Sequence, residues 1–553
     1  MTGRLTRGNL KQGFAFGLVV AFGASFAAPA SAAVLPVTNT HDSGPGSLRQ
    51  AIVDAEVDPA GDLIDIQTTG TVSLLSALPD LGTEVDMAGP GAGDFNIRRG
   101  AGGDYHILGV TQLGDVSVSG VTLSHGSVTG LPAQGGGVVN LGSLSLDGVV
   151  VRDNTAASVG PAFNPTARGG GIYNAGSLDL TETSVRDNEA VAATDDQFAQ
   201  VTVEGGGIYN EGTLTLDAST VNANDANGSA PNAVDCCASA LATGGGIQND
   251  GTLGATNSTV SGNGADVTVP ADVSLAGSNG GGIAVQANNT ATTLRSVTLA
   301  FNAASGAANS SQRNGAIFTA QNTIIAQPQG GGSNCSLIGG AVLVDNGHNL
   351  DDDSSCGFDD PTDHEGVDPL LEPLADNGGS TQTHALPKSS PAVDQGTSSA
   401  SPSDQRGFAR PFDFADIPNG LGDGSDIGAF ELTAEPEPPV VTPSPPASPS
   451  PDHCAGEAVT IHAVAGQRTV GTAGRDVILG TAGPDVIRAG TGDDVICGID
   501  AGDRVRGGSG RDEIDGGDGD DRLRGGRGHD VVDGGPGSDR CRGGADELKE
   551  CER

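Results

Sequence analysis

Short runs of alternating apolar and polar residues recur through the middle of the chain, each following a glycine triplet. The two fullest copies are GGGIYNAGSLDLTETSVRDN (169–188) and GGGIYNEGTLTLDASTVNAN (205–224). In the first copy Leu178 and Leu180 alternate with polar residues, and a period of two is typical of a strand that buries one face. Each copy therefore predicts short strands separated by tight turns.

These copies share a core of fixed length. The triplets begin at Gly135, Gly169, Gly205, Gly244 and Gly280. One asparagine ends the first strand of a copy and another ends the third, and the residues are Asn140, Asn174, Asn210 and Asn249, then Asn154, Asn188, Asn224, Asn263 and Asn302. The variable segments between copies are 155–168, 189–204, 225–243 and 264–279. A constant core with variable insertions predicts a right-handed parallel β-helix whose asparagines occupy left-handed corners and form ladders, with all insertions on one flank.

A second repeat, of nine residues, extends from Gly471 to Arg542. The sixth position is aspartate in all eight copies: Asp476, Asp485, Asp494, Asp503, Asp512, Asp521, Asp530 and Asp539. Six residues of each copy suit a glycine-rich turn and three suit a minimal strand with one inward apolar residue. So little apolar burial does not offset the entropy of ordering, and stacked aspartates repel each other, so the pattern predicts a bound cation. In the fourth copy Ala501 and Gly502 are exchanged, which predicts the weakest site there.

This G-G-x-G-x-D-x-U-x pattern resembles the RTX (haemolysin-type) calcium-binding repeats. The resemblance implies a parallel β-roll with calcium between the turns of repeats two apart, which would pair Asp494 with Asp512 and Asp503 with Asp521. The expected ligands are the eight aspartates and backbone oxygens of turn glycines, namely Gly508, Gly510, Gly517, Gly519, Gly526 and Gly528. Binding of Ca²⁺ would then be inseparable from folding of this segment.

Composition and charge restrict the class of protein further. The chain has 553 residues, with 69 acidic against 27 basic side chains and a net charge of −42, which excludes nucleic acid and anionic membranes as favoured partners. There are 89 glycines, three tyrosines and no tryptophan, a balance that favours a solenoid with frequent turns over an ordinary globular core.

The N-terminal segment 1–32 predicts a secretory signal peptide. It has a basic start, an apolar stretch over 14–28 and a small-residue cleavage site at 30–32. The apolar stretch is too short and too rich in alanine and glycine for a membrane anchor, and no membrane span is expected. We therefore expect a secreted, extracellular protein, with association to a cell surface left open.

A short helix is expected directly after the predicted cleavage site. Ser47 is a plausible N-cap, and Gln50 three residues later would complete a capping box. Leu48, Ile52 and Ala55 mark one apolar face. Such a helix would cover the first rung of the solenoid, where strand edges and core are otherwise open.

The segment 320–432 contains QNTIIAQ, HNLDDDSSC, DPLLEPLADNGG and DIGAFE. These motifs resemble the closing region of bacterial secreted β-helix proteins, the choice-of-anchor Q domain. The resemblance implies a fold and no particular activity. The expected all-β organisation is a signal peptide at 1–32, a β-helix with an N-terminal cap at 33–330, the closing region at 331–432, a proline/serine linker at 433–453 and the calcium-binding β-roll at 454–553.

Eight cysteines in an exported chain predict disulfides. The expected pairs are Cys335–Cys356, Cys454–Cys497 and Cys541–Cys551, with a bond between the adjacent Cys236 and Cys237 left open. Sequence alone does not prove this connectivity. No C-x-x-C pair is present, so a zinc site is not expected.

Two Arg-Asp pairs are the main candidates for catalysis, and Asp195-Asp196 in the second insertion is expected to be a solvated loop. Arg152-Asp153 and Arg186-Asp187 occupy the same place in successive copies, so their carboxylates would stack roughly 5 Å apart, close enough to share a cation. A surface charge ladder is the favoured interpretation, and no catalytic residue or cofactor other than Ca²⁺ is assigned.

The function expected from these features is that of a secreted calcium-binding structural or adhesive protein. Its β-helix would present an interaction surface to an extracellular glycan, a matrix or a cell surface. The alternative is an extracellular polysaccharide lyase or glycoside hydrolase on the β-helix scaffold. Catalysis is the less favoured reading, because the chain has no H-E-x-x-H or G-x-S-x-G motif.

Overall fold

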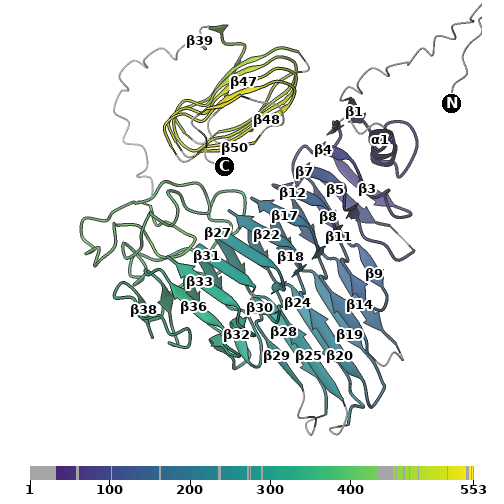
Figure 1. Cartoon of the computed structure of the whole chain (residues 1–553), viewed down its shortest axis with the longest axis vertical. Coiled ribbons are helices and arrows are strands. Elements are labelled where there is room, and N and C mark those ends of the chain that lie inside the picture. Colours follow the sequence, from purple (N-terminus) through teal and green to yellow (C-terminus); the bar gives the residue numbers. More distant parts are fainter. Residues whose placement is uncertain are drawn as a thin grey trace, which may run out of the picture.

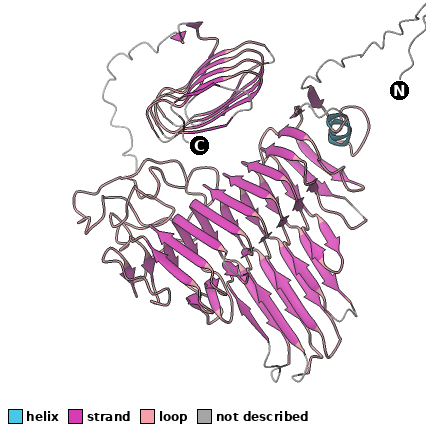
Figure 2. Cartoon of the chain, viewed as in Figure 1, coloured by secondary structure: helices cyan, strands magenta, loops and turns pink. Residues whose placement is uncertain are grey.

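In the residues that it describes, the structure, a computed structural model, is almost entirely β, with one short helix (Figure 2). It describes residues 33–57, 61–100, 102–160, 164–234, 238–270, 273, 276–287, 290–433, 453–455, 457–464, 468–472, 474–483, 485–519, 521–537, 539–542, 547–549 and 551. The predicted signal peptide, most of the predicted linker and the Cys236/Cys237 pair lie outside these residues. Within them, no helix has the length and apolar character needed to cross a membrane.

Three columns of parallel strands build a β-helix (Figure 1). The first column is β1 (Val34–Val37), β2 (Asp62–Ile66), β4 (Glu84–Ala88), β7 (Asp115–Ser119), β12 (Ser143–Asp147), β17 (Ser177–Thr181), β22 (Thr213–Asp217), β27 (Thr252–Ser261), β31 (Ala291–Ala300), β33 (Ile317–Gln321) and β36 (Val342–Asp345). The second is β3 (Gly70–Leu74), β5 (Phe95–Arg99), β8 (Thr122–Ser124), β13 (Val150–Arg152), β18 (Ser184–Arg186), β23 (Thr220–Asn222), the second halves of β27 and β31, β34 (Ile324–Ala326), β37 (Leu350–Asp351) and β38 (His364–Glu365). The third is β6 (Leu108–Val110), β11 (Val138–Asn140), β16 (Ile172–Asn174), β21 (Ile208–Asn210), β26 (Ile247–Asn249), β30 (Ile283–Val285), β32 (Ala307–Gln312) and β35 (Ser333–Leu337).

The repeating apolar residues stack in register inside the β-helix. Leu178 and Leu180 of β17 align with Leu214 and Leu216 of β22, and all four side chains are buried in one continuous core. Because register in a parallel sheet determines which face each residue occupies, the period-two pattern alone directs these leucines inward. The sequence prediction of a parallel β-helix is confirmed.

Buried asparagines form two ladders along the β-helix. In the first, Asn140 Nδ2 donates to Asn174 Oδ1 at 2.7 Å, and the contact repeats from Asn174 to Asn210 and from Asn210 to Asn249. In the second, every step pairs an amide nitrogen with the amide oxygen of the next rung, through Asn154, Asn188, Asn224, Asn263, Asn302, Asn309 and Asn334. Each side chain is both donor and acceptor, so the ladder satisfies itself.

The left-handed corner residue is not the asparagine itself, contrary to the sequence prediction. It is the residue just before the second-ladder asparagine, as at Asp153 (φ 56°), Asp187 (φ 55°) and Ala223 (φ 51°). The left-handed residue turns the chain, and the asparagine that follows can then point into the ladder.

The variable segments are strands, which the sequence did not predict. They pair with one another in two further sheets and form a two-layered fin beside the β-helix (Figure 1). One sheet is β9 (Ser127–Thr129), β14 (Thr155–Val159), β19 (Glu189–Ala193), β24 (Asp225–Ser229) and β28 (Gly264–Thr268); the other is β10 (Ala133–Gln134), β15 (Thr166–Arg168), β20 (Gln200–Glu204), β25 (Ser239–Thr243) and β29 (Ala276–Asn279). A separate core of alanine and valine, including Ala190, Ala192, Val201 and Val203, fills the space between them.

The predicted N-terminal helix is α1 (Leu48–Ala55), and it contacts β1 and β2. Ser47 Oγ accepts from the Gln50 backbone N–H at 3.3 Å, which confirms the N-cap. The Gln50 side chain does not complete a capping box, because it donates instead to Asp54. Leu48 and Ile52 are fully buried, so the helix covers the open end of the core.

The chain from 368 to 432 folds back over the outside of the second column. Thr220 Oγ1 donates to the Gln382 carbonyl at 2.7 Å, and Thr259 Oγ1 donates to the Gln405 side chain at 2.6 Å. A small apolar cluster that includes Ile324 attaches this segment to the β-helix. The segment therefore covers a side of the solenoid as well as its end.

Among the described residues three disulfides are present, and they are the pairs that the sequence predicted: Cys335–Cys356, Cys454–Cys497 and Cys541–Cys551. The first lies near the end of the β-helix core, and the other two lie in the C-terminal region.

The nonapeptide segment forms a flattened roll of two parallel sheets (Figure 1). The first sheet is β41 (Ile461–His462), β43 (Val477–Leu479), β45 (Val495–Cys497), β47 (Glu513–Asp515), β49 (Val531–Asp533) and β51 (Glu547–Lys549). The second is β42 (Arg468–Val470), β44 (Val486–Thr491), β46 (Arg504–Ser509), β48 (Arg522–Arg527) and β50 (Arg540–Arg542), and a hairpin of β39 (His453–Cys454) and β40 (Glu457–Ala458) precedes both. The core is a single file of the predicted apolar residues, such as Ile478, Ile487 and Ile496.

Candidate calcium site

From the third to the seventh repeat, the turns that join the two sheets of the roll have left-handed backbone at the second and fourth positions of the nonapeptide. The predicted ligand glycines occupy these positions, with φ of 119° at Gly508, 135° at Gly510, 95° at Gly517, 146° at Gly519, 113° at Gly526 and 141° at Gly528. Glycine adopts this backbone without steric cost.

The fourth repeat has side chains at both of these positions. Ile499 has φ 96° and Ala501 has φ 74°, where the neighbouring repeats have glycine. A residue with a Cβ costs roughly 1–2 kcal/mol in left-handed backbone. The departure that sequence noted at Ala501 is therefore a local strain in the turn.

The aspartates form two buried ladders, one on each side of the roll. The backbone N–H of Asp476 donates to Asp494 Oδ1 at 2.8 Å, and the same bond joins Asp485 to Asp503 at 2.8 Å and Asp494 to Asp512 at 3.0 Å. It continues through Asp503 to Asp521, Asp512 to Asp530 and Asp521 to Asp539. The predicted neighbours two repeats apart are thus brought into direct contact.

The second oxygen of several carboxylates has no hydrogen-bond partner although it is buried. These atoms are Asp485 Oδ1, Asp494 Oδ2, Asp503 Oδ2 and Asp512 Oδ2. A buried polar atom without a partner costs about 1–3 kcal/mol, and more when it is charged.

The ladder also raises the pKa of its carboxyl groups. Burial, and then the charges of Asp521 and Asp485, raise the pKa of Asp503 to about 8. Burial together with Asp530 and Asp494 raises the pKa of Asp512 to about 7. Negative charge in the ladder is therefore unfavourable unless a positive charge accompanies it.

The first two repeats differ because threonine replaces glycine at the second position. Thr472 donates its backbone N–H to Asp476 Oδ2 at 2.6 Å, and its hydroxyl contacts both oxygens of the same carboxylate. Thr481 donates its N–H to Asp485 Oδ2 at 2.5 Å. The nonapeptide period does not distinguish Asp476 and Asp485 from the other aspartates, and the threonines at 472 and 481 are the sequence signal that does.

The donor set fits a hard cation. Carboxylate oxygens without partners lie beside turns made of backbone carbonyls, and Ca²⁺ takes 6–8 oxygen ligands of both kinds. Space for a side chain is lacking, since a Cβ on Gly507 would meet Asp512 Oδ2 and a Cβ on Gly498 would meet Asp503 Oδ2. No three His, Cys, Asp or Glu side chains converge as a metal cluster in the part of the chain that the structure describes.

Comparison with known families supports this chemistry. Residues 470–498, 498–532 and 515–547 match the family model of the RTX calcium-binding nonapeptide repeat. The C-terminal segment therefore carries RTX calcium-binding repeats, as predicted from its sequence. Searches of curated proteins and of solved structures found no match to this chain.

The two Arg-Asp pairs considered for catalysis are surface ion pairs. Arg152 Nη1 contacts Asp153, and Arg186 Nη1 contacts Asp187, so each carboxylate is bound by its own neighbour. Both aspartates are the left-handed corner residues described above, a conformation that aspartate tolerates better than most residues. Their recurrence in the sequence thus follows from the corner geometry.

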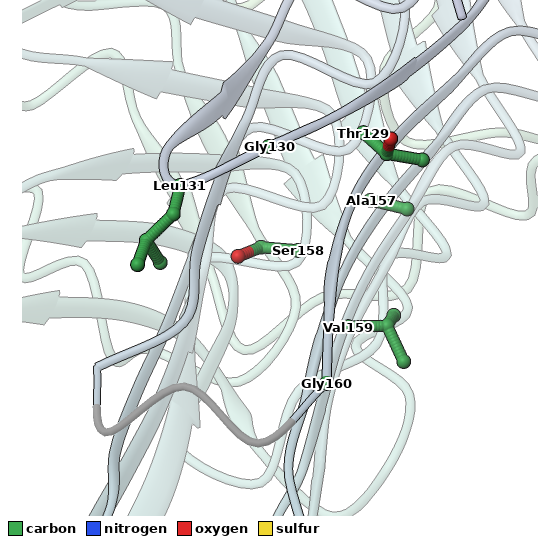
Figure 3. A pocket seen from close by; sticks show the side chains of 7 residues that line it. All are labelled: Thr129, Gly130, Leu131, Ala157, Ser158, Val159 and Gly160. Carbon is green, nitrogen blue, oxygen red and sulfur yellow. The ribbon is translucent and has the colours of Figure 1, made fainter. Parts of the chain in front are cut away.

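A shallow hollow lies at the outer edge of the fin (Figure 3). It has a volume of about 500 Å³ and is lined by Thr129, Gly130, Leu131, Ala157, Ser158, Val159 and Gly160. Leu131 and Val159 are 60% and 68% exposed beside it. A second hollow continues along the edge to Asp195, Asp196 and Pro231.

Proposed function

We propose that the protein is a secreted calcium-binding structural or adhesive protein. Calcium would be bound by the aspartate ladders of the roll, and the β-helix with its fin would present the interaction surface. The observation that supports this most strongly is the row of buried carboxylate oxygens without partners in a segment that matches RTX calcium-binding repeats.

Within the roll, we propose the main calcium ligands among Asp494, Asp503 and Asp512, with the carbonyl oxygens of the turn glycines that follow the fourth repeat. These carboxylates each use one oxygen for the ladder bond and keep the other available. Asp476 would contribute least, because Thr472 already bonds its carboxylate. Asp485, Asp521, Asp530 and Asp539 complete the two ladders.

Secretion is supported by two features besides the N-terminal sequence. RTX repeats are typical of secreted proteins, and three disulfides fit an oxidising compartment. The stacked GGG copies and the closing motifs also support the resemblance to secreted β-helix proteins with a choice-of-anchor Q domain.

We propose the outer edge of the fin, meaning the turns at 129–131, 159–160, 193–198 and 229–231, as the adhesive surface. Leu131, Val159 and Phe198 are exposed there beside the hollows. These turns lie on successive rungs and bring exposed apolar side chains and the acidic pair Asp195 and Asp196 to one edge, which suits an extended glycan or matrix chain.

Calcium binding is tested on the full chain by isothermal titration calorimetry and by far-UV circular dichroism after chelation. We expect calcium to bind and to increase the β signal, and magnesium to do so much less, because it demands near-ideal octahedral geometry. Absence of calcium binding would refute the calcium function.

Adhesion is tested with a panel of acidic glycans and matrix proteins in calcium buffer. A Leu131→Ser/Val159→Ser/Phe198→Ser variant should lose binding, whereas Leu113→Ser, which changes an apolar residue 86% exposed outside the fin, should keep it. Equal binding by both variants would refute the fin edge as the surface. Release of shortened glycan products would instead favour the lyase or hydrolase.

A further inference from the structure

The two sheets of the roll expose different side chains. The fourth, sixth and eighth repeats place arginine on both sides of their inward residue (RVR at 504–506, RLR at 522–524 and RCR at 540–542) and the second ends in VIR, whereas the odd-numbered repeats end in VIL, VIC, EID and VVD. The strands of the even-numbered repeats belong to one sheet, and their register aligns Arg488, Arg506 and Arg524 in one column. We call the strands β44, β46 and β48 the arginine sheet. In a chain of net charge −42, this sheet is a concentrated basic surface.

The arginine sheet lies against the first column of the β-helix (Figure 1). Arg506 Nη2 lies 3.1 Å from Asp86 Oδ1 and donates to Ser117 Oγ at 2.9 Å. Arg488 Nη2 lies 3.2 Å from Asp147 Oδ2. These contacts join residues more than 340 positions apart in the sequence.

Two more ion pairs continue the contact along the same column. Arg504 pairs with Glu182, and Arg522 pairs with Asp217. Arginine is always protonated in proteins, so both pairs join opposite charges. The four carboxylates, Asp86, Asp147, Glu182 and Asp217, are called the acidic column.

The arginine sheet and the first column of the β-helix are built in the same way. Both are stacks of parallel strands about 4.8 Å apart, and the four arginines reach carboxylates on four different rungs of the β-helix: Asp86 on β4, Asp147 on β12, Glu182 directly after β17 and Asp217 on β22. Small residues such as Ser117 and Ser119 allow the guanidinium groups to approach closely, and Arg488 also donates to Ser119 Oγ at 2.6 Å. A single exposed ion pair is worth little, but an array of them held by two rigid sheets gains from multivalency.

We propose that the arginine sheet is a docking surface for the acidic column, and that calcium, by folding the roll, closes this face of the β-helix. Arginines that are 18 residues apart in the sequence are gathered only when β44, β46 and β48 stack. The second column is covered by residues 368–432, so the roll encloses a different side. The calcium dependence rests on the calcium function proposed above, whereas the docking does not.

Small-angle X-ray scattering of the full chain tests the docking, with circular dichroism on the same samples reporting whether the roll is folded. The wild type should have a smaller radius of gyration in calcium than in EGTA. An Arg488→Glu/Arg506→Glu variant should keep the calcium-induced circular dichroism change, because its inward residues Ile487 and Val505 are intact, but lose the compaction. Sodium chloride at about 1 M, where the Debye length is about 3 Å, should also weaken compaction.

Controls separate charge complementarity from general damage. Arg511→Glu reverses an exposed arginine on a turn of the roll and should compact like the wild type. Asp86→Arg/Asp147→Arg should lose compaction, and joining it to Arg488→Glu/Arg506→Glu should restore it. Equal compaction in the wild type and in Arg488→Glu/Arg506→Glu would overturn the docking. A wild type without any calcium-induced circular dichroism change would refute the calcium function, while the scattering difference between wild type and variant in one buffer still decides the docking.

Discussion

Both the β-helix and the roll stack polar residues at the corners of successive rungs, but the β-helix uses asparagine and the roll uses aspartate. In the β-helix the Asn154 backbone N–H donates to Asn188 Oδ1 at 3.1 Å, and in the roll the Asp476 N–H donates to Asp494 Oδ1 at 2.8 Å. The ladders therefore have the same backbone-to-side-chain bond. They differ in the remaining atom, which is an amide Nδ2 in one and a carboxylate oxygen in the other.

That remaining side-chain atom determines whether every buried polar atom of the ladder has a hydrogen-bond partner. Asn188 Nδ2 donates to Asn224 Oδ1 and to the Val151 carbonyl, so the asparagine ladder lacks nothing. The corresponding Asp494 Oδ2 has no partner, and burial beside other carboxylates raises the pKa of Asp494. The difference in core size acts in the same direction, since each nonapeptide places one strand apolar residue in the shared core, and a second small cluster adds only Val477, Leu479 and Val495 of the first and third repeats. The comparison implies an autonomous β-helix and a roll that requires a cation.

We expect the largest effect on stability when an asparagine of the β-helix ladder is replaced by aspartate, the residue that forms the ladders of the roll. Asn188→Asp would direct a buried carboxylate oxygen at the Val151 carbonyl and at Asn224 Oδ1, with no donor available. We expect the β-helix to lose roughly 3 kcal/mol or more of unfolding free energy, measured by urea unfolding of the full chain in calcium. Asn164→Asp, at an exposed position, should change it little. Equal effects of the two substitutions would contradict the role of the ladder.

The converse change weakens the metal site. Asp512→Asn keeps an oxygen for the Asp494 N–H but removes the charge and the free oxygen. We expect calcium affinity to fall on the order of tenfold or more, a loss of about 1.4 kcal/mol or more, by calorimetric titration. Asp515→Asn, which lies exposed on a strand three residues away, serves as the control. If Asp515→Asn weakens binding as much as Asp512→Asn, the ladder is not the site.

A smaller gain is expected from relieving the strained turn of the fourth repeat. Ala501→Gly places glycine where φ is 74° and should stabilise the calcium-loaded roll by about 0.5–1 kcal/mol, after the extra chain entropy of glycine is subtracted. Ala489→Gly removes a buried methyl from the core at a position without positive φ, so it should destabilise the roll. Thermal unfolding of the roll in calcium measures both, and shifts of the same sign would contradict the explanation.

The smallest effect is a pH dependence of stability that comes from a buried carboxylate paired with an arginine of the fin. Glu204 lies next to Arg168, with Arg168 Nε donating to Glu204 Oε2 at 2.8 Å, yet burial raises the pKa of Glu204 above its usual 4.5. The folded state therefore binds this proton more tightly than the unfolded state, and its contribution to stability is lost as pH rises above about 4.5. The stability of the wild type relative to Glu204→Gln should fall between pH 4 and pH 7, measured by melting temperature. A constant or rising difference would contradict this sign.

The sequence predicted those parts of the fold in which the same residue type recurs at a fixed position in every rung. Asn188, Leu178 and Asp494 recur at fixed offsets, and each offset corresponds to one physical requirement of a stacked strand. The fin was missed because its strands differ in sequence from rung to rung, and its core of Ala190 and Ala192 lacks the contrast between apolar and polar residues that marks a strand.

The candidate site was predicted in outline and refined by geometry. The aspartate period and the glycine turns can be read from the sequence. The hydrogen bonds from Thr472 to the Asp476 carboxylate cannot be read from this period. The contact of Arg506 with Asp86 joins two segments that only the complete fold brings together. Local patterns specify rungs, whereas contacts between solenoids depend on how the rungs are assembled.

The central claim is that only the aspartate ladder depends on a cation. Hydrogen–deuterium exchange of the full chain, followed by peptide mass spectrometry with and without EGTA, measures both ladders at once. The claim predicts that peptides within 471–542 exchange rapidly in EGTA and become protected in calcium, while peptides within 138–302 stay protected in both. Protection of 471–542 in EGTA equal to that in calcium, or loss of protection in 138–302 on chelation, would contradict it.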